Sequence, residues 1–118
     1  MDIKEIRNMI KLACDALEDK KGENINIINV GEVSVIADYF IIANGTNNSQ
    51  INAMVDSVDE ALSKAGYHHN NIEGINNSSW ILMDYGDIIV HIFSREDREF
   101  YNLEHVWGDC KVVSKEDL

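Results

Sequence analysis

An unbroken run of apolar side chains constrains the fold of this chain more than any other feature. Residues 37–43 include Tyr39, Phe40, Ile41 and Ile42 in direct succession. Side chains alternate between the two faces of a strand, so a run of this kind is typical of a strand covered on both faces. The run therefore predicts an inner strand of a sheet with other elements packed against it.

Two amphipathic helices are predicted from apolar residues that recur at spacings of three and four. The first is expected from about residue 3 to residue 20, with Asp2 as its N-cap and Gly22 just after its end. The second follows an asparagine-rich turn at residues 44–48 and stops at Gly66.

Three further segments predict strands, because they are short apolar runs with many β-branched or aromatic residues. They are residues 25–30, 80–83 and 88–93. Residues 84–87 have the sequence Asp-Tyr-Gly-Asp and suit a tight hairpin turn between the last two strands. A capping-box pattern at Ser94 predicts a short helix after the hairpin.

This order of helices and strands predicts an α+β fold with an α/β-like, mixed sheet. We expect about five strands, with helices packed on the sheet. The length fits a single domain that spans residues 1–118. Residues 109–118 are mostly polar and are expected to form a frayed tail.

An excess of acidic side chains restricts the class of partner. The formal net charge is -11, and residues 22–94 carry nine acids against a single basic residue, Lys64. Nucleic acids and anionic membranes attract Lys and Arg, so we expect neither direct DNA binding nor membrane binding. A basic protein is the electrostatically favoured partner, although the same charge would also serve solubility alone.

Two observations predict a cytoplasmic protein. No stretch approaches the roughly 20 apolar residues of a membrane span. The N-terminus also lacks the charged-then-apolar pattern of an export signal. Cys14 and Cys110 form no CxxC pair and are expected to be free thiols in a reducing compartment.

Nucleotidyl transfer is the first enzymatic hypothesis. Gly45 and Thr46 lie between a predicted strand and a predicted helix, where backbone N–H groups can hold a phosphate. Such an enzyme also needs carboxylates that converge on Mg²⁺. The best pair, Asp84 and Asp87, is three residues apart across a turn, whereas residues two apart share one face of a strand. We therefore expect no enzyme, and a capped turn is the simpler interpretation.

Metal and cofactor sites are not predicted either. The histidines and the two cysteines show neither HxxxH nor CxxC spacing, and no nucleophile elbow occurs. His91 lies between Val90 and Ile92 in a predicted strand, a position more typical of a histidine paired with a neighbour. We expect no metal and no cofactor.

A surface for protein recognition is the last hypothesis drawn from the residues. Alternation along the strand places Trp80, Leu82 and Asp84 on one face. Tyr85 is expected at the tip of the turn. Aromatic residues beside carboxylates are typical of a binding hot spot for a basic partner. The alternative interpretation is that Trp80 belongs to the core.

Three long blocks of the sequence resemble the Iojap family, the ribosomal silencing factors. The blocks are SVIADYFIIANGTN at residues 34–47, WILMDYGDIIVHIF at residues 80–93 and REFYNLEHVWGD at residues 98–109. The resemblance covers about residues 3–110. One departure is Asn44, which stands where a Ser or Thr is usual.

The resemblance implies a nucleotidyltransferase-like fold that lacks the catalytic carboxylates. It further implies a non-catalytic factor that binds the large ribosomal subunit through ribosomal protein uL14. Such a factor blocks joining of the small subunit and represses translation under nutrient limitation. It also implies a homodimer when the protein is free. The implied binding residues are Trp80, Leu82, Asp84, Tyr85, Asp87 and His91, with Thr46, Tyr101, Leu103 and Trp107 as further candidates.

Two other functions stay open at this point. One is a residual nucleotidyltransferase-like enzyme acting on a small substrate. The other is a large-subunit assembly factor without silencing activity, which would use the same docking surface.

Overall fold

The sheet is built around two parallel strands, β2 (Tyr39–Gly45) and β5 (Ile88–Ser94). Their register places Tyr39 opposite Ile88 and Gly45 opposite Ser94. The computed structural model describes residues 2–74, 79–108 and 110–114. Within them the α+β fold and the mixed sheet predicted from the sequence are confirmed, with six strands instead of about five.

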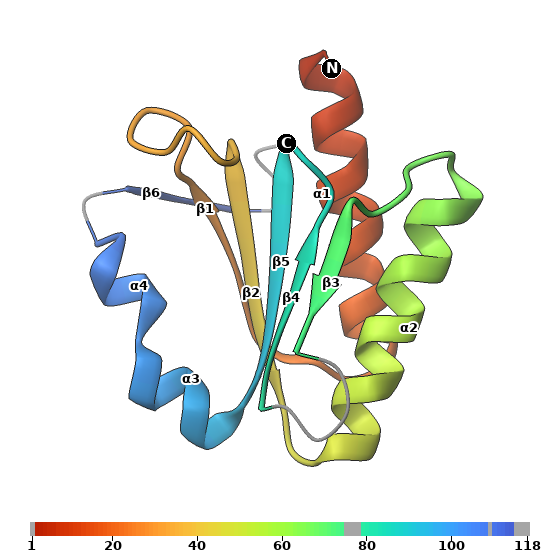
Figure 1. Ribbon diagram of the computed structural model, residues 1–118, viewed down its shortest axis with the longest axis vertical. Helices are drawn as coiled ribbons and strands as arrows, with labels where there is room; N and C mark the ends of the chain where they lie inside the picture. The colour runs from red at the N-terminus through yellow and green to blue at the C-terminus, as the bar shows by residue number, and fades with distance from the viewer. Residues whose placement is uncertain (1, 75–78, 109, 115–118) are drawn as a thin grey trace.

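Antiparallel strands flank the parallel pair on both sides (Figure 1). On one side lies β1 (Glu23–Asn29), followed at the edge by β6 (Lys111–Val113). On the other side lies β4 (Trp80–Asp84), followed at the edge by β3 (Asn71–Glu73). The strand order is therefore β3-β4-β5-β2-β1-β6.

The two faces of the sheet are covered unequally (Figure 1). Two long helices, α1 (Ile3–Asp19) and α2 (Asn48–Lys64), pack side by side on one face. Two short helices, α3 (Arg95–Tyr101) and α4 (Leu103–Val106), lie on the opposite side. The short helices contribute no fully buried residue, so the second face is only partly covered.

Side-chain caps fix where three of the helices begin, as the sequence predicts. The Asp2 carboxylate accepts a hydrogen bond from the Glu5 N–H, and the Ser94 hydroxyl accepts one from the Asp97 N–H. At α2 the cap is Asn47, whose side-chain oxygen accepts from the Gln50 N–H. Each cap satisfies a backbone donor that has no partner inside the helix.

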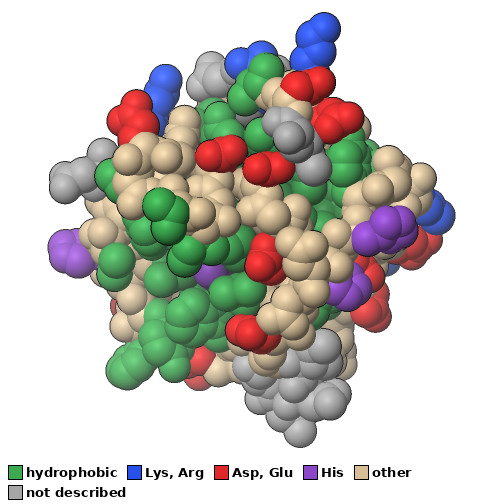
Figure 2. All heavy atoms as spheres, turned by 45° about the horizontal axis from the view of Figure 1, so that its top comes forward, with side chains coloured by type: hydrophobic (Ala, Val, Ile, Leu, Met, Phe, Trp, Pro, Cys, Tyr) green, Lys and Arg blue, Asp and Glu red, His purple; other side chains and the backbone are tan. Residues whose placement is uncertain are grey.

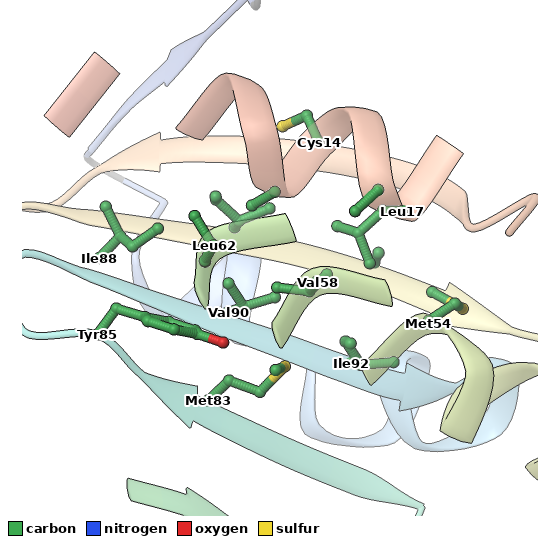
Figure 3. Packing of buried hydrophobic residues seen from close by; sticks show 14 of the residues in the cluster. Cys14, Leu17, Met54, Val58, Leu62, Met83, Tyr85, Ile88, Val90 and Ile92 are labelled. Carbon is green, nitrogen blue, oxygen red and sulfur yellow. The ribbon is translucent and has the colours of Figure 1, made fainter. Parts of the chain in front are cut away.

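A hydrophobic core of buried side chains lies between α1, α2 and the sheet (Figure 3). Leu17, Val58, Leu62 and Val90 are completely buried in it. A second buried cluster, which includes Phe40, lies on the opposite face. Because β2 contributes to both clusters, the prediction that its apolar run is covered on both faces is confirmed.

The C-terminal segment differs from the sequence prediction. Instead of a frayed tail over residues 109–118, Lys111–Val113 forms β6 and pairs with β1. Val113 packs against the core, while residues 109 and 115–118 lie outside the described part of the chain. Backbone pairing with a strand more than 80 residues earlier leaves no local signal, which explains the error.

Arg98 fastens the two short helices to the sheet. Its guanidinium donates to the Glu104 carboxylate at 2.9 and 3.2 Å, to the Asn44 side-chain oxygen at 2.9 Å and to the Glu23 carbonyl oxygen at 3.2 Å. Only 10% of the Arg98 side chain is exposed. The guanidinium holds the pKa of Glu104 below its usual value. Asn44 is therefore part of this network.

Substituting Arg98→Met should lower the free energy of unfolding by about 2 kcal/mol, because Glu104 and Asn44 lose a partly buried partner. Glu104 stabilises the fold above its ordinary pKa of 4.5 and loses this contribution as the pH falls through its lowered pKa. The difference in free energy of unfolding between Arg98→Met and wild type should therefore become smaller at acidic pH. Denaturant unfolding at several pH values measures both effects.

The matched control is Arg95→Met, which removes an exposed arginine that pairs with Glu23. Exposed ion pairs contribute little, so this variant should unfold much like wild type. Equal destabilisation of the two variants would contradict the role assigned to Arg98.

Candidate docking site

Strand β4 divides its side chains between the two faces of the sheet, as its alternation predicts. Ile81 and Met83 are buried in the core beneath α1 and α2. Trp80 and Leu82 lie on the opposite face, where both are half-buried. Figure 2 shows hydrophobic side chains gathered on the left of the view, the side on which α3 and α4 lie in Figure 1.

Trp80 is surrounded by aromatic rings on this face. Its ring stacks on Phe93 with 5.0 Å between centroids and contacts Tyr101 at 4.7 Å. Its indole N–H donates to His91 Nδ1 at 3.1 Å. Phe40 connects this group to Trp107 through an edge contact at 5.2 Å.

Five of the predicted residues therefore meet over the second buried cluster. We call them the aromatic face; they are Trp80, Leu82, Tyr101, Leu103 and Trp107. Their side chains are half-buried, except for Tyr101, which is 43% exposed. The sequence offers two interpretations of Trp80, a binding residue or a core residue. Both apply in part, because part of the ring packs inward and part stays accessible. A role in binding stays a prediction for all five.

Acidic residues lie beside the aromatic face. Glu73, Gly74, Trp80 and Leu82 line a shallow groove at the edge of β4. Asp84, half-buried at the end of β4, accepts a hydrogen bond from the Gly86 N–H at 2.8 Å and shapes the turn. Apolar side chains with carboxylates nearby suit a basic partner.

Thr46 lies at the opposite end of the sheet from the Asp84–Asp87 turn. The register of β2 and β5 places the two ends roughly 20 Å apart, at about 3.3 Å for each residue of strand. The Thr46 N–H and hydroxyl both donate to the side-chain oxygen of Gln50, at 2.6 and 2.9 Å. The turn and the carboxylates that nucleotidyl transfer would require are therefore not brought together.

Tyr85 corrects a prediction from the sequence. Instead of standing exposed at the tip of the hairpin, it is buried in the core beneath α2 (Figure 3). Its hydroxyl donates to the Asp59 carboxylate of α2 at 2.8 Å, and burial raises the pKa of that hydroxyl above its usual value. The alternation of β4 continues past Asp84, so Tyr85 falls on the same face as Met83.

His91 is also inaccessible to a partner. It is 3% exposed, and burial lowers its pKa to about 4, so the imidazole is neutral at physiological pH.

Among the described residues, no three His, Cys, Asp or Glu side chains gather as a metal site would require. No helix in residues 2–74, 79–108 and 110–114 has the length and hydropathy needed to cross a bilayer.

Several exposed apolar residues were missed by the sequence analysis. Val33, Val35 and Ile36 lie in the loop between β1 and β2, and Phe100 and Val106 lie on the short helices. The signal that could have found the loop residues is an apolar triplet between strands, outside any helical or strand periodicity. These side chains are further candidates for contact with a partner.

The fold is therefore an α+β sheet with one face closed by two long helices and a second, partly open face that carries aromatic side chains. The family described as "Ribosomal silencing factor during starvation" matches residues 3–118. The chain belongs to this ribosomal silencing factor (RsfS) family.

Individual relatives agree with this assignment. The chain is 34% identical to the ribosomal silencing factor RsfS of Halalkalibacterium halodurans over 112 residues, 95% of this chain and 96% of that protein. It is 33% identical over 102 residues to the chloroplastic protein Iojap of Zea mays, covering 83% of this chain and 42% of the maize protein.

Solved structures have the same fold. A crystal structure of a Chromobacterium violaceum protein superposes with a TM-score of 0.85 at 35% identity, covering 92% of this chain and 88% of that one. A Bacillus halodurans crystal structure gives a TM-score of 0.80 at 31% identity, covering 91% and 97%.

Substituting Tyr85→Phe should lower the free energy of unfolding by about 1–2 kcal/mol, because the Asp59 carboxylate loses a hydrogen bond from a buried hydroxyl. Binding to any partner of the aromatic face should stay unchanged, since Tyr85 lies on the other face. Thermal unfolding and a binding assay on the same samples measure the two effects. Weaker binding with normal stability would return Tyr85 to the docking surface.

Proposed function

We propose that this protein represses translation by docking its aromatic face on ribosomal protein uL14 of the large ribosomal subunit. Docking there would block joining of the small subunit when nutrients are limited. The observation that carries the proposal is the half-buried Trp80, held on an apolar surface beside carboxylates, in a chain of the RsfS family. The proposal extends the family assignment to a particular partner and mechanism.

Charge complementarity supports a ribosomal partner. A protein that sits on ribosomal RNA needs Lys and Arg to neutralise phosphates, so its accessible surface tends to be basic. This chain carries a net charge of -11, Glu73 lines the groove with Trp80 and Leu82, and Asp84 ends the same strand as these two residues. Opposite charges steer association, while the central aromatic residues contribute most of the affinity.

The proposed mechanism needs no chemistry, so we propose that the protein is not an enzyme and works without a cofactor. The described fold extends 34 × 33 × 25 Å, which is large enough to occupy a surface that the small subunit requires. We also propose a cytoplasmic location, and a homodimer when the protein is free. Exposed apolar residues such as Phe100 and Val112 support self-association, because their burial between two copies is favourable.

A role in subunit assembly is the second candidate. A mouse relative that is 29% identical to this chain is named "Mitochondrial assembly of ribosomal large subunit protein 1". This chain spans 44% of the mouse protein. An assembly factor would use the same docking surface but would leave the joining of mature subunits unaffected.

Sucrose-gradient sedimentation with purified bacterial subunits tests the proposal. Wild-type protein should migrate with the large subunit and reduce the joined particle when small subunits are added. Trp80→Ala should weaken large-subunit binding roughly 30-fold, because truncating a central aromatic residue costs about 2 kcal/mol. Melting temperatures are measured on the same samples.

The control is Tyr67→Ala, which truncates a half-buried aromatic residue on the face that α1 and α2 cover. It should lose stability but bind as wild type does. A stable Trp80→Ala variant that binds normally would remove Trp80 from the interface. Binding without any loss of the joined particle would favour assembly over silencing.

A further inference from the structure

A hydrogen bond and a ring contact join His91 to Trp80. The two residues lie on neighbouring strands, and His91 pairs in register with Leu82. His91 Nδ1 accepts the indole N–H of Trp80 at 3.1 Å, and the Phe40 ring contacts the imidazole edge-on at 4.7 Å. His91 Nδ1 is therefore directed at the residue on which the proposed docking depends.

This geometry fixes the tautomer of His91. Because Nδ1 accepts a hydrogen bond, the proton of the neutral ring must be on Nε2. Among the described residues, Nε2 is buried with no hydrogen-bond partner. A buried donor without an acceptor destabilises a fold, and an apolar side chain of similar size would remove that cost. Stability alone therefore does not account for a histidine at this position.

We propose that His91 is a positioning residue, which holds the indole of Trp80 in the orientation that binds the partner without touching the partner itself. This inference rests on the proposed function. Stacking on Phe93 and a tilted contact with Tyr101 restrict the tilt of the Trp80 ring, but these two contacts by themselves do not fix its rotation about the side-chain bonds. A hydrogen bond to the indole N–H removes that freedom before the partner arrives.

Holding the Trp80 ring in place in this way should raise the affinity of the protein for the large subunit. A side chain that is already immobilised loses little rotational freedom on binding, which strengthens the complex. Losing the His91 acceptor should therefore weaken docking about tenfold. The bond is intact near neutral pH, because burial keeps His91 unprotonated down to about pH 4.

Three variants separate positioning from a structural role. His91→Phe and His91→Leu remove the acceptor together with the unpartnered Nε2 donor. They should melt at or above the wild-type temperature, yet bind purified bacterial large subunits about tenfold more weakly. His91→Asn can place its side-chain oxygen near the Nδ1 position. It should melt lower, because a buried amide replaces the ring, and bind within about threefold of wild type.

The free protein gives a second readout. The indole N–H resonance of Trp80, assigned by its loss in Trp80→Phe, should move toward that of a water-exposed indole in His91→Phe and His91→Leu. It should stay near its wild-type position in His91→Asn. His68→Phe is the control, because His68 is exposed on the chain that follows α2 and should change neither the resonance nor the binding.

Affinity that falls in step with melting temperature across the three variants would overturn the positioning role. So would an unmoved indole resonance, or wild-type binding by the stable Phe and Leu variants. Wild-type protein that fails to bind large subunits would overturn the proposed function, and the positioning role with it. Wild-type binding that is unaffected in His91→Phe would overturn the positioning role alone.

Discussion

The parallel pair β2 and β5 must be shielded from water on both faces, and the described part of the chain provides two long helices to do it. Both of these helices pack on the same face, where they bury Ile41, Val90 and Ile92. The opposite face holds Phe40, Ile42 and Phe93, and the short α3–α4 segment covers it in part, together with Val30 and Ala37 from the loop between β1 and β2. The network around Arg98 keeps that segment in place. Because the covering is unequal, one face of the sheet is closed by helices and the other keeps aromatic side chains partly exposed.

The two faces of the sheet consequently have different roles. The face under α1 and α2 provides the larger hydrophobic core, where the buried Tyr85 hydroxyl donates a hydrogen bond to Asp59. The other face keeps Trp80 and Leu82 half-buried, supported by rings and by His91. Aromatic residues that are ordered but accessible are suited to recognition, because little freedom remains to be lost on binding. This is the face on which we propose that the ribosome docks.

The sequence predicts the features that depend on local pattern. These features are the apolar run in β2, the capping motifs at Asp2 and Ser94, and the alternation that gives β4 its two faces. It does not predict features that depend on register between distant segments. These include β6 and the bonds from Arg98 to Asn44, 54 residues apart. The position of Tyr85 could have been predicted by continuing the alternation of β4 one residue further.

Hydroxyl-radical footprinting of the protein on the large ribosomal subunit tests the central claim most directly, because it reports the accessibility of individual side chains. The account predicts that Trp80, Leu82 and Tyr101 lose reactivity on binding. Tyr67, on the face covered by α1 and α2, and the exposed Ile3 of α1 should react as in the free protein. Protection of Tyr67 and Ile3 with unchanged reactivity of Trp80 would show that the helical face docks instead, and would contradict the account.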